Sequence, residues 1–167
     1  MTPRRFLIAA VFFWCAAIVA TPLLGSFGGS GANAASISYQ FFSRVCHQLD
    51  SRSFHIAGGK FAVCIRCTSI YAAFFLGIVL FPALSRTGVT AVSGRVILAL
   101  SALPMALDVA LDGIGLHEST VSTRVVTGAL FGFALGIILA PLLEELLQKI
   151  FSRLNNFIRT TYATKTR

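Results

Sequence analysis

The chain has 167 residues, of which 56% are hydrophobic and only 12% are charged, a composition that excludes a water-soluble globular domain and indicates an integral membrane protein. The formal charge is +8. In so apolar a chain the basic residues are expected at cytoplasmic helix ends and on anionic lipid, so this charge does not indicate nucleic-acid binding. The length predicts one all-α membrane domain, residues 1–167, with about four spanning helices of roughly 20 residues each.

Four apolar segments predict the spanning helices: residues 6–24, 62–84, 96–114 and 125–143. The first segment resembles a signal peptide, but its apolar core is longer than a typical cleaved leader and favours a retained anchor. Residues 25–61 are predicted to form a loop on the exoplasmic side. Within it, residues 25–35 are rich in Gly, Ser and Ala and indicate a flexible linker, whereas residues 36–49 suggest a short helix at the membrane interface.

Residues 142–167 are predicted to form an amphipathic tail, because apolar residues recur at spacings of three and four with charged residues opposite. The tail would lie on the cytoplasmic membrane surface or pack on a partner. The positive-inside rule uses the basic residues near the helix ends, which are Arg4, Arg5, Arg86, Arg95, Lys149, Arg153, Arg159, Lys165 and Arg167. It places both termini in the cytoplasm, and we expect the protein in the bacterial cytoplasmic (inner) membrane as a multi-pass protein.

In this topology several metal-binding residue types gather near the exoplasmic end of the bundle, namely Cys46, His47, His55, Cys64 and Cys67. The C-x-x-C spacing brings two thiolates within reach of one tetrahedral ion, and a third thiolate with a histidine would complete a zinc site. Two alternatives remain open. Cys46 could bridge Cys64 or Cys67 in a structural disulfide without any cofactor, or Cys64 and Cys67 could act as a redox dithiol.

Asp108 and Asp112 share one face of the third segment, because they lie four residues apart on a helix. Ionisable groups inside a spanning helix are costly, so these carboxylates should face the bundle interior or a wet cavity. We expect Arg66 and Arg124 to approach them. The arginines would either neutralise the carboxylates in internal ion pairs or bind an anionic headgroup. In an enzyme, Asp108 or Asp112 would be the catalytic general base.

The fourth segment carries Gly128, Gly132 and Gly136 at a spacing of four residues. Small residues at this spacing allow a neighbouring helix to approach closely. The glycines indicate packing inside the bundle or, as the alternative, a homodimer or larger membrane complex formed through this face.

The runs Phe42–Gln48, Arg52–His55 and Val63–Tyr71 contain C-H-Q, R-S-F and C-x-R-C-T. Together with the later Asp112-Gly113, Arg124 and Gly128, this pattern resembles the uncharacterised prokaryotic membrane-protein family called domain-of-unknown-function family 2085. The resemblance covers about residues 39–136, and Ser69 departs from it where the family has glycine. It implies a polytopic fold in which the Cys, His, Arg and Asp positions form one site, and it implies no established activity.

Two classes of function remain open on this basis. In the first, the metal, most simply zinc, is a closed structural site and the protein is an accessory or interaction subunit in the lipid bilayer. In the second, the protein is a metal-dependent hydrolase or transferase acting on a lipid-linked substrate held by Arg66 and Arg124. Thiol-disulfide exchange at the cysteines is the third possibility.

Overall fold

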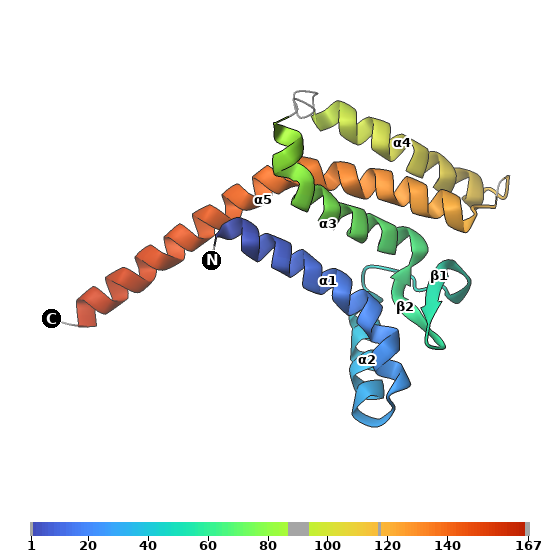
Figure 1. Cartoon of the computed structure of the whole chain (residues 1–167), viewed down its shortest axis with the longest axis horizontal. Coiled ribbons are helices and arrows are strands. Elements are labelled where there is room, and N and C mark those ends of the chain that lie inside the picture. The colour runs from blue at the N-terminus through green and yellow to red at the C-terminus, as the bar shows by residue number, and fades with distance from the viewer. Residues whose placement is uncertain (1, 87–93, 117, 166–167) are drawn as a thin grey trace.

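The computed structural model describes residues 2–86, 94–116 and 118–165, with side chains as far as Phe157. Its elements in chain order are α1 (Pro3–Ser26), α2 (Gly29–Phe42), the 3-10 turn η1 (Asp50–Arg52), β1 (Ser53–Ile56), β2 (Gly59–Cys64), α3 (Ile65–Ser85), α4 (Gly94–Gly113) and α5 (Val121–Lys165) (Figure 1). The prediction of an all-α bundle is confirmed, with one small hairpin added to it.

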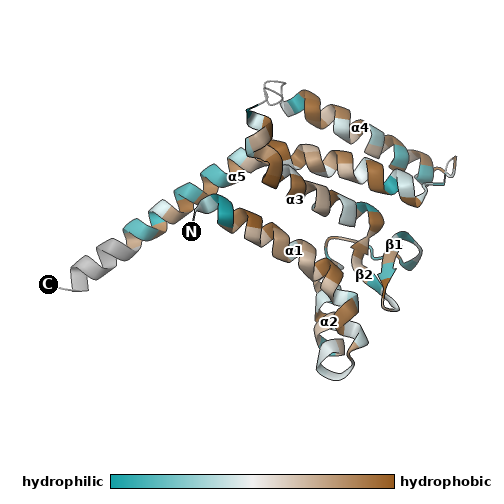
Figure 2. Cartoon of the chain, viewed as in Figure 1, coloured by the Kyte–Doolittle hydropathy of each residue, from teal (hydrophilic) through white to brown (hydrophobic). Residues whose placement is uncertain are grey.

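Four of the described helices are long and apolar enough to cross a membrane: Pro3–Ser26, Ile65–Ser85, Gly94–Gly113 and Val121–Phe157. They lie side by side in the order α4, α5, α3, α1, and Figure 2 shows that most of the residues along them are hydrophobic. Large side chains such as Phe13 and Leu100, each 68% exposed, point outward from this bundle. Because an apolar surface of this extent is stable only in lipid, the bundle is that of a membrane protein.

The close contact between α3 and α5 depends on glycine. A Cβ atom at Gly132 would lie 2.2 Å from the carbonyl oxygen of Ile70, and one at Gly136 would lie 2.5 Å from that of Phe74. A Cβ atom at Gly128 would lie 2.8 Å from the carbonyl oxygen of Arg66. The prediction of packing inside the chain is therefore confirmed. In the structure α3 covers the three glycines, and the alternative of a homodimer or larger complex through this face stays a prediction.

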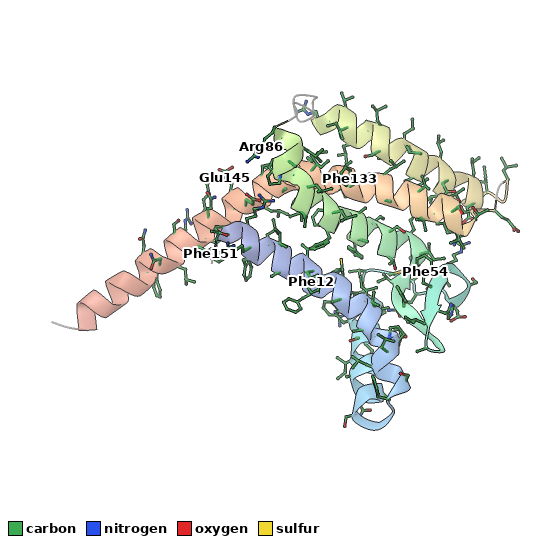
Figure 3. All side chains as sticks on the ribbon, in the orientation of Figure 1. Phe12, Phe54, Arg86, Phe133, Glu145 and Phe151 are labelled. Atoms are coloured by element: carbon green, nitrogen blue, oxygen red, sulfur yellow. The ribbon has the colours of Figure 1, made fainter. Side chains whose placement is uncertain are left out.

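Two clusters of buried side chains stabilise opposite ends of the bundle. Leu7, Ile78 and Ala140 form one of them, where α1, α3 and α5 meet. Ile18, Phe42, Cys46, Ala62 and Val63 form the other, where α1, α2 and β2 meet. Figure 3 shows the same separation, with Arg86 and Glu145 at one end and Phe54 at the other. Cys46 belongs both to the second cluster and to the site described below.

The flexible linker predicted for residues 25–35 is wrong, because α2 begins at Gly29 and packs on α1. Its small residues serve close packing. Ala35 is 4% exposed, and a Cβ atom at Gly31 would lie 2.5 Å from the carbonyl oxygen of Leu24. The helix predicted for residues 36–49 ends at Phe42, so the chain around Cys46 is a turn.

The spanning segment predicted to begin at residue 62 begins three residues later, because Gly59–Cys64 is strand β2 of an antiparallel hairpin. The hairpin turn contains Ala57 and Gly58, whose φ angles are +51° and +77°. Two consecutive positive φ angles are typical of a tight two-residue turn between right-twisted strands. As a result Cys64 precedes the first turn of α3 and does not lie inside the helix.

The fourth spanning segment and the tail form one continuous helix of 45 residues, α5. Beyond the start of α1 this helix leaves the bundle and extends alone (Figure 1). Its side chains Leu146, Ile150 and Leu154 are more than half exposed, and they follow the spacing of an amphipathic helix. Positions 166 and 167 of the predicted tail lie outside the described residues.

Candidate metal centre and polar cluster

The turn after α2 brings Cys46 to the start of α3. The N–H of Cys46 donates to the carbonyl of Phe42, and two residues later the chain reverses at Gln48, which has a φ of +52°. The side-chain amide of Gln48 donates to the carbonyls of Tyr39, at 2.9 Å, and of Ala62, at 2.7 Å. Gln48 therefore joins α2 to β2 and holds the Cys46 turn between them. This role was not predicted, although the C-H-Q run is its signal in the sequence.

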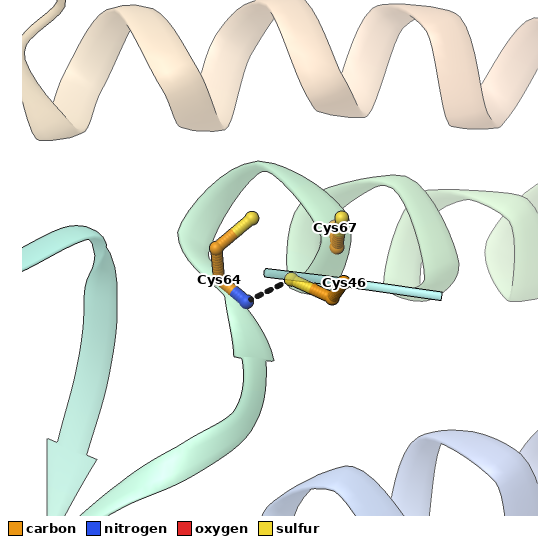
Figure 4. A group of neighbouring side chains, drawn as sticks. All are labelled: Cys46, Cys64 and Cys67. Carbon is orange, nitrogen blue, oxygen red and sulfur yellow. Dashed lines mark hydrogen bonds between the residues drawn. The ribbon is translucent and has the colours of Figure 1, made fainter. Parts of the chain in front are cut away.

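Three thiols meet at this point (Figure 4). The Sγ atoms of Cys46, Cys64 and Cys67 all lie within 4.8 Å of one another, and none of the three forms a disulfide. The N–H of Cys64 donates to the Sγ of Cys46 at 3.1 Å, and the N–H of Gln48 approaches the same sulfur at 3.5 Å. Cys46 is 8% exposed. The site is thus a compact group of sulfur ligands in which one sulfur already accepts backbone hydrogen bonds.

One thiol of the group is prepared to lose its proton. A hydrogen bond from the Cys67 thiol, with support from backbone N–H groups and Cys46, lowers the pKa of Cys64 from 9.0 to about 5, although burial opposes the shift. A thiolate at neutral pH is the form of cysteine that binds metal. The cluster can therefore present at least one anionic sulfur without help from a histidine.

The two predicted histidine ligands lie in different places. His47 is exposed and lines a cavity beside the thiols. His55 is on β1, and its Nε2 lies 3.3 Å from Oδ1 of Asp50. Among the described residues, the group close enough to share one ion contains the three cysteines and neither histidine. Of the two histidines, only His47 lines the cavity that the three cysteines also line.

The carboxylates of α4 are held by arginine. Arg66, in the first turn of α3, forms an ion pair with Asp108, which is 8% exposed. Arg124 Nη2 lies 3.5 Å from Oδ2 of Asp112. Ser119 joins the pairs, because its hydroxyl donates to Asp108 at 2.9 Å and its N–H donates to Asp112 at 3.2 Å. The predicted ion pairs are confirmed.

A third arginine, Arg52, also pairs with one of these carboxylates, although the sequence placed it only in a loop. Arg52 Nη1 lies 3.2 Å from Oδ2 of Asp112, so η1 contacts the end of α4. No periodicity predicted this contact, because Arg52 lies in a turn. The R-S-F run of the family pattern was its only signal.

The arginines and thiols share one cavity of about 190 Å³. Its lining residues are Val45, Cys46, His47, Gln48, Leu49, Arg52, Cys64, Arg66, Cys67 and Arg124. Asp108 and Asp112 are not among the lining residues, and each forms an ion pair with an arginine that is. The arrangement suits binding of a metal ion by sulfur and of an anion by guanidinium groups.

Residues 46–138 match the family model described as "Predicted membrane protein (DUF2085)". The chain is also 36% identical over 97 residues to "Uncharacterized protein MJ1492" of Methanocaldococcus jannaschii. That alignment spans 58% of this chain and 62% of the archaeal protein, so the chain covers less than two thirds of its relative. No solved structure matches the chain. Because the family model spans more than half of the chain, from the first thiol of the cluster to the glycines of α5, the chain belongs to the membrane-protein family DUF2085.

Proposed function

We propose that this membrane protein binds one thiophilic divalent ion, zinc first among them, through Cys46, Cys64 and Cys67. The observation that carries the proposal is the mutual approach of three sulfur atoms from two separate parts of the chain within 4.8 Å. A tetrahedral site with bonds of about 2.3 Å has its sulfur corners roughly 3.8 Å apart. The observed spacing therefore needs only a small contraction to hold such an ion.

The surroundings of the thiols favour a metal over a disulfide. A disulfide would use two of the three sulfurs and leave the third in contact with the bond. The hydrogen bond from Cys67 to Cys64 stabilises a thiolate at Cys64. The fourth coordination position would be filled by His47, which lines the same cavity, or by a ligand from outside the chain.

We propose a structural role for the ion in an accessory or interaction protein. Cys46 follows α2, Cys64 ends β2 and Cys67 belongs to α3, so one ion would fasten the hairpin and the turn to the bundle. A role for Asp108 or Asp112 as a general base has less support, because each carboxylate is engaged by arginine and serine and neither lines the cavity.

We also propose how the protein is oriented in its membrane. The start of α1, the end of α3 and the start of α4 lie at the end of the bundle away from the thiols, where α5 also leaves the bundle (Figure 1). The basic residues of these segments are Arg4, Arg5, Arg86, Arg95, Lys149 and Arg153. At the thiol end, Arg52, Arg66 and Arg124 are paired with aspartate. We therefore assign the thiol end to the exoplasmic side of a prokaryotic cytoplasmic membrane and both termini to the cytoplasm.

The experiment measures metal content and thiol modification on the same sample of full-length protein in detergent. We expect about one zinc per chain, and we expect mass spectrometry after alkylation to find Cys46, Cys64 and Cys67 protected until a chelator is added. Cys46→Ser and Cys67→Ser should each lose most of the metal, whereas Cys15→Ser, outside the cluster, should retain it. Metal-free protein with oxidised cysteines would overturn the proposal in favour of a disulfide.

A further inference from the structure

The cavity beside the thiols is lined by three arginines. Among the described residues that line it, Arg52, Arg66 and Arg124 contribute guanidinium groups and no residue contributes a carboxylate. Its volume of about 190 Å³ is far more than the roughly 10–15 Å³ that one water molecule needs. The cavity therefore has room for a polyatomic anion.

The aspartates hold the arginines in place without closing the cavity. Asp112 is shared by Arg52 and Arg124, and Asp108 accepts from Arg66. Arg52 and Arg124 therefore share one carboxylate, and neither has an aspartate to itself in these ion pairs. Because each guanidinium has five N–H donors and each ion pair engages only some of them, further donors remain for a ligand.

Arg66 provides an independent sign that a polar ligand is missing from its environment. Its Nε atom is buried and has no hydrogen-bond partner among the described residues. The same side chain lines the cavity. Buried donors in native proteins nearly always have a partner, which can be protein, water or ligand. The Nε atom of Arg66 lacks the partner that buried donors normally have, next to a cavity that the same side chain lines.

We propose that this cavity binds a phosphate-type anion through Arg52, Arg66 and Arg124. The three guanidinium groups come from different elements, η1, α3 and α5, and so approach a ligand from different directions. Such an arrangement fits the several oxygens of a tetrahedral oxyanion better than a planar carboxylate, which one guanidinium can engage in full. The site does not depend on a bound metal, since its donors are arginines alone.

The source of the anion is free phosphate or the headgroup of an anionic lipid, and two arms of one experiment distinguish them. Full-length protein in neutral detergent is titrated calorimetrically with inorganic phosphate. In parallel, native mass spectrometry compares retention of phosphatidic acid with that of phosphatidylcholine. We expect binding in at least one arm. If the protein binds inorganic phosphate alone, the ligand is a free anion. If it selectively retains phosphatidic acid, the ligand is a lipid headgroup.

The variants are Arg52→Gln and Arg66→Gln, with Arg44→Gln as the matched control, because Arg44 is an exposed arginine of the same loop outside the cavity lining. We expect each cavity variant to weaken anion binding about tenfold, the usual effect of losing one charge-assisted hydrogen bond. Arg52→Gln keeps the test valid if Arg66→Gln fails to fold, because the Arg52 side chain is 44% exposed. Absence of binding in both arms, or equal weakening by the control, would overturn the proposal. Zinc content measured on each sample keeps this result separate from that for the thiols.

Discussion

Asp108 and Arg66 form an ion pair within the bundle, with side chains 7% and 17% exposed. Because the guanidinium would be left buried without its partner, we expect Asp108→Ala to lower the free energy of unfolding by about 3–5 kcal/mol. Denaturant unfolding in detergent micelles measures this loss. Glu145→Ala serves as the control, since Glu145 pairs with Lys149 on the exposed surface of α5 and its loss should change little. Equal stability of the two variants would contradict the role given to Asp108.

Gln48 connects α2 with the hairpin through two carbonyl groups, and the thiol site depends on that connection. Gln48→Leu removes both hydrogen bonds and should cost about 1–3 kcal/mol, because two carbonyls lose their donors. It should also reduce the zinc retained after dialysis, since the Cys46 turn is no longer held. Gln40→Leu, an exposed change on α2, is the matched control. If Gln48→Leu retained all of its zinc, the metal site would not depend on the hydrogen bonds that hold the Cys46 turn.

At the scale of elements, the contact between α3 and α5 sets the frame for the site, because Arg66 and Arg124 lie at its end. A Cβ at Gly132 would meet the backbone of Ile70 at 2.2 Å, so Gly132→Ala must move one helix and should cost about 1–3 kcal/mol or more. Gly113→Ala is the control, because nothing lies within 4 Å of its Cβ position. Thermal unfolding in detergent compares the two, and an unchanged melting temperature for Gly132→Ala would refute the close packing.

The spanning helices could be predicted from hydropathy, since each needs a run of apolar residues and nothing else in the chain supplies one. The glycine face of α5 was also predictable, because a spacing of four residues aligns small side chains on one side of a helix. The hairpin and α2 were missed for a physical reason. Small residues favour close packing as well as flexibility, so Gly29–Ala35 is ambiguous in sequence, and the Ala57-Gly58 turn was a signal that was not used.

At the scale of the whole molecule, α5 packs against the bundle as far as Phe151. Arg4 Nε lies 3.8 Å from Oε1 of Glu144, and Phe6 contacts Phe151 with ring centroids 5.6 Å apart. Leu154 and Phe157, further along, are exposed. A chain ending at Arg153 should therefore melt within a few degrees of the full chain, whereas one ending at Leu142 should melt well below it, because Leu143 and Leu147 pack in the buried cluster of that end. Equal melting temperatures for both truncations would contradict this division of α5.

The convergence of the thiols and arginines at one end followed from topology and could be predicted. The four crossings place Cys46, Cys64 and the end of α4 on the same side whatever the details of the loop. The participation of Arg52 and Gln48 could not be derived in this way, because both act from an irregular turn whose path depends on hydrogen bonds to α2 and β2. Hydropathy and helical periodicity contain no information on such a turn.

X-ray absorption at the zinc edge of the purified full-length protein tests the central proposal most directly. If Cys46, Cys64 and Cys67 hold the ion, the spectrum will show three sulfur neighbours at about 2.3 Å and one lighter neighbour at roughly 2.0–2.1 Å. A coordination shell of nitrogen and oxygen alone, or protein that binds no zinc when its thiols are reduced, would contradict it.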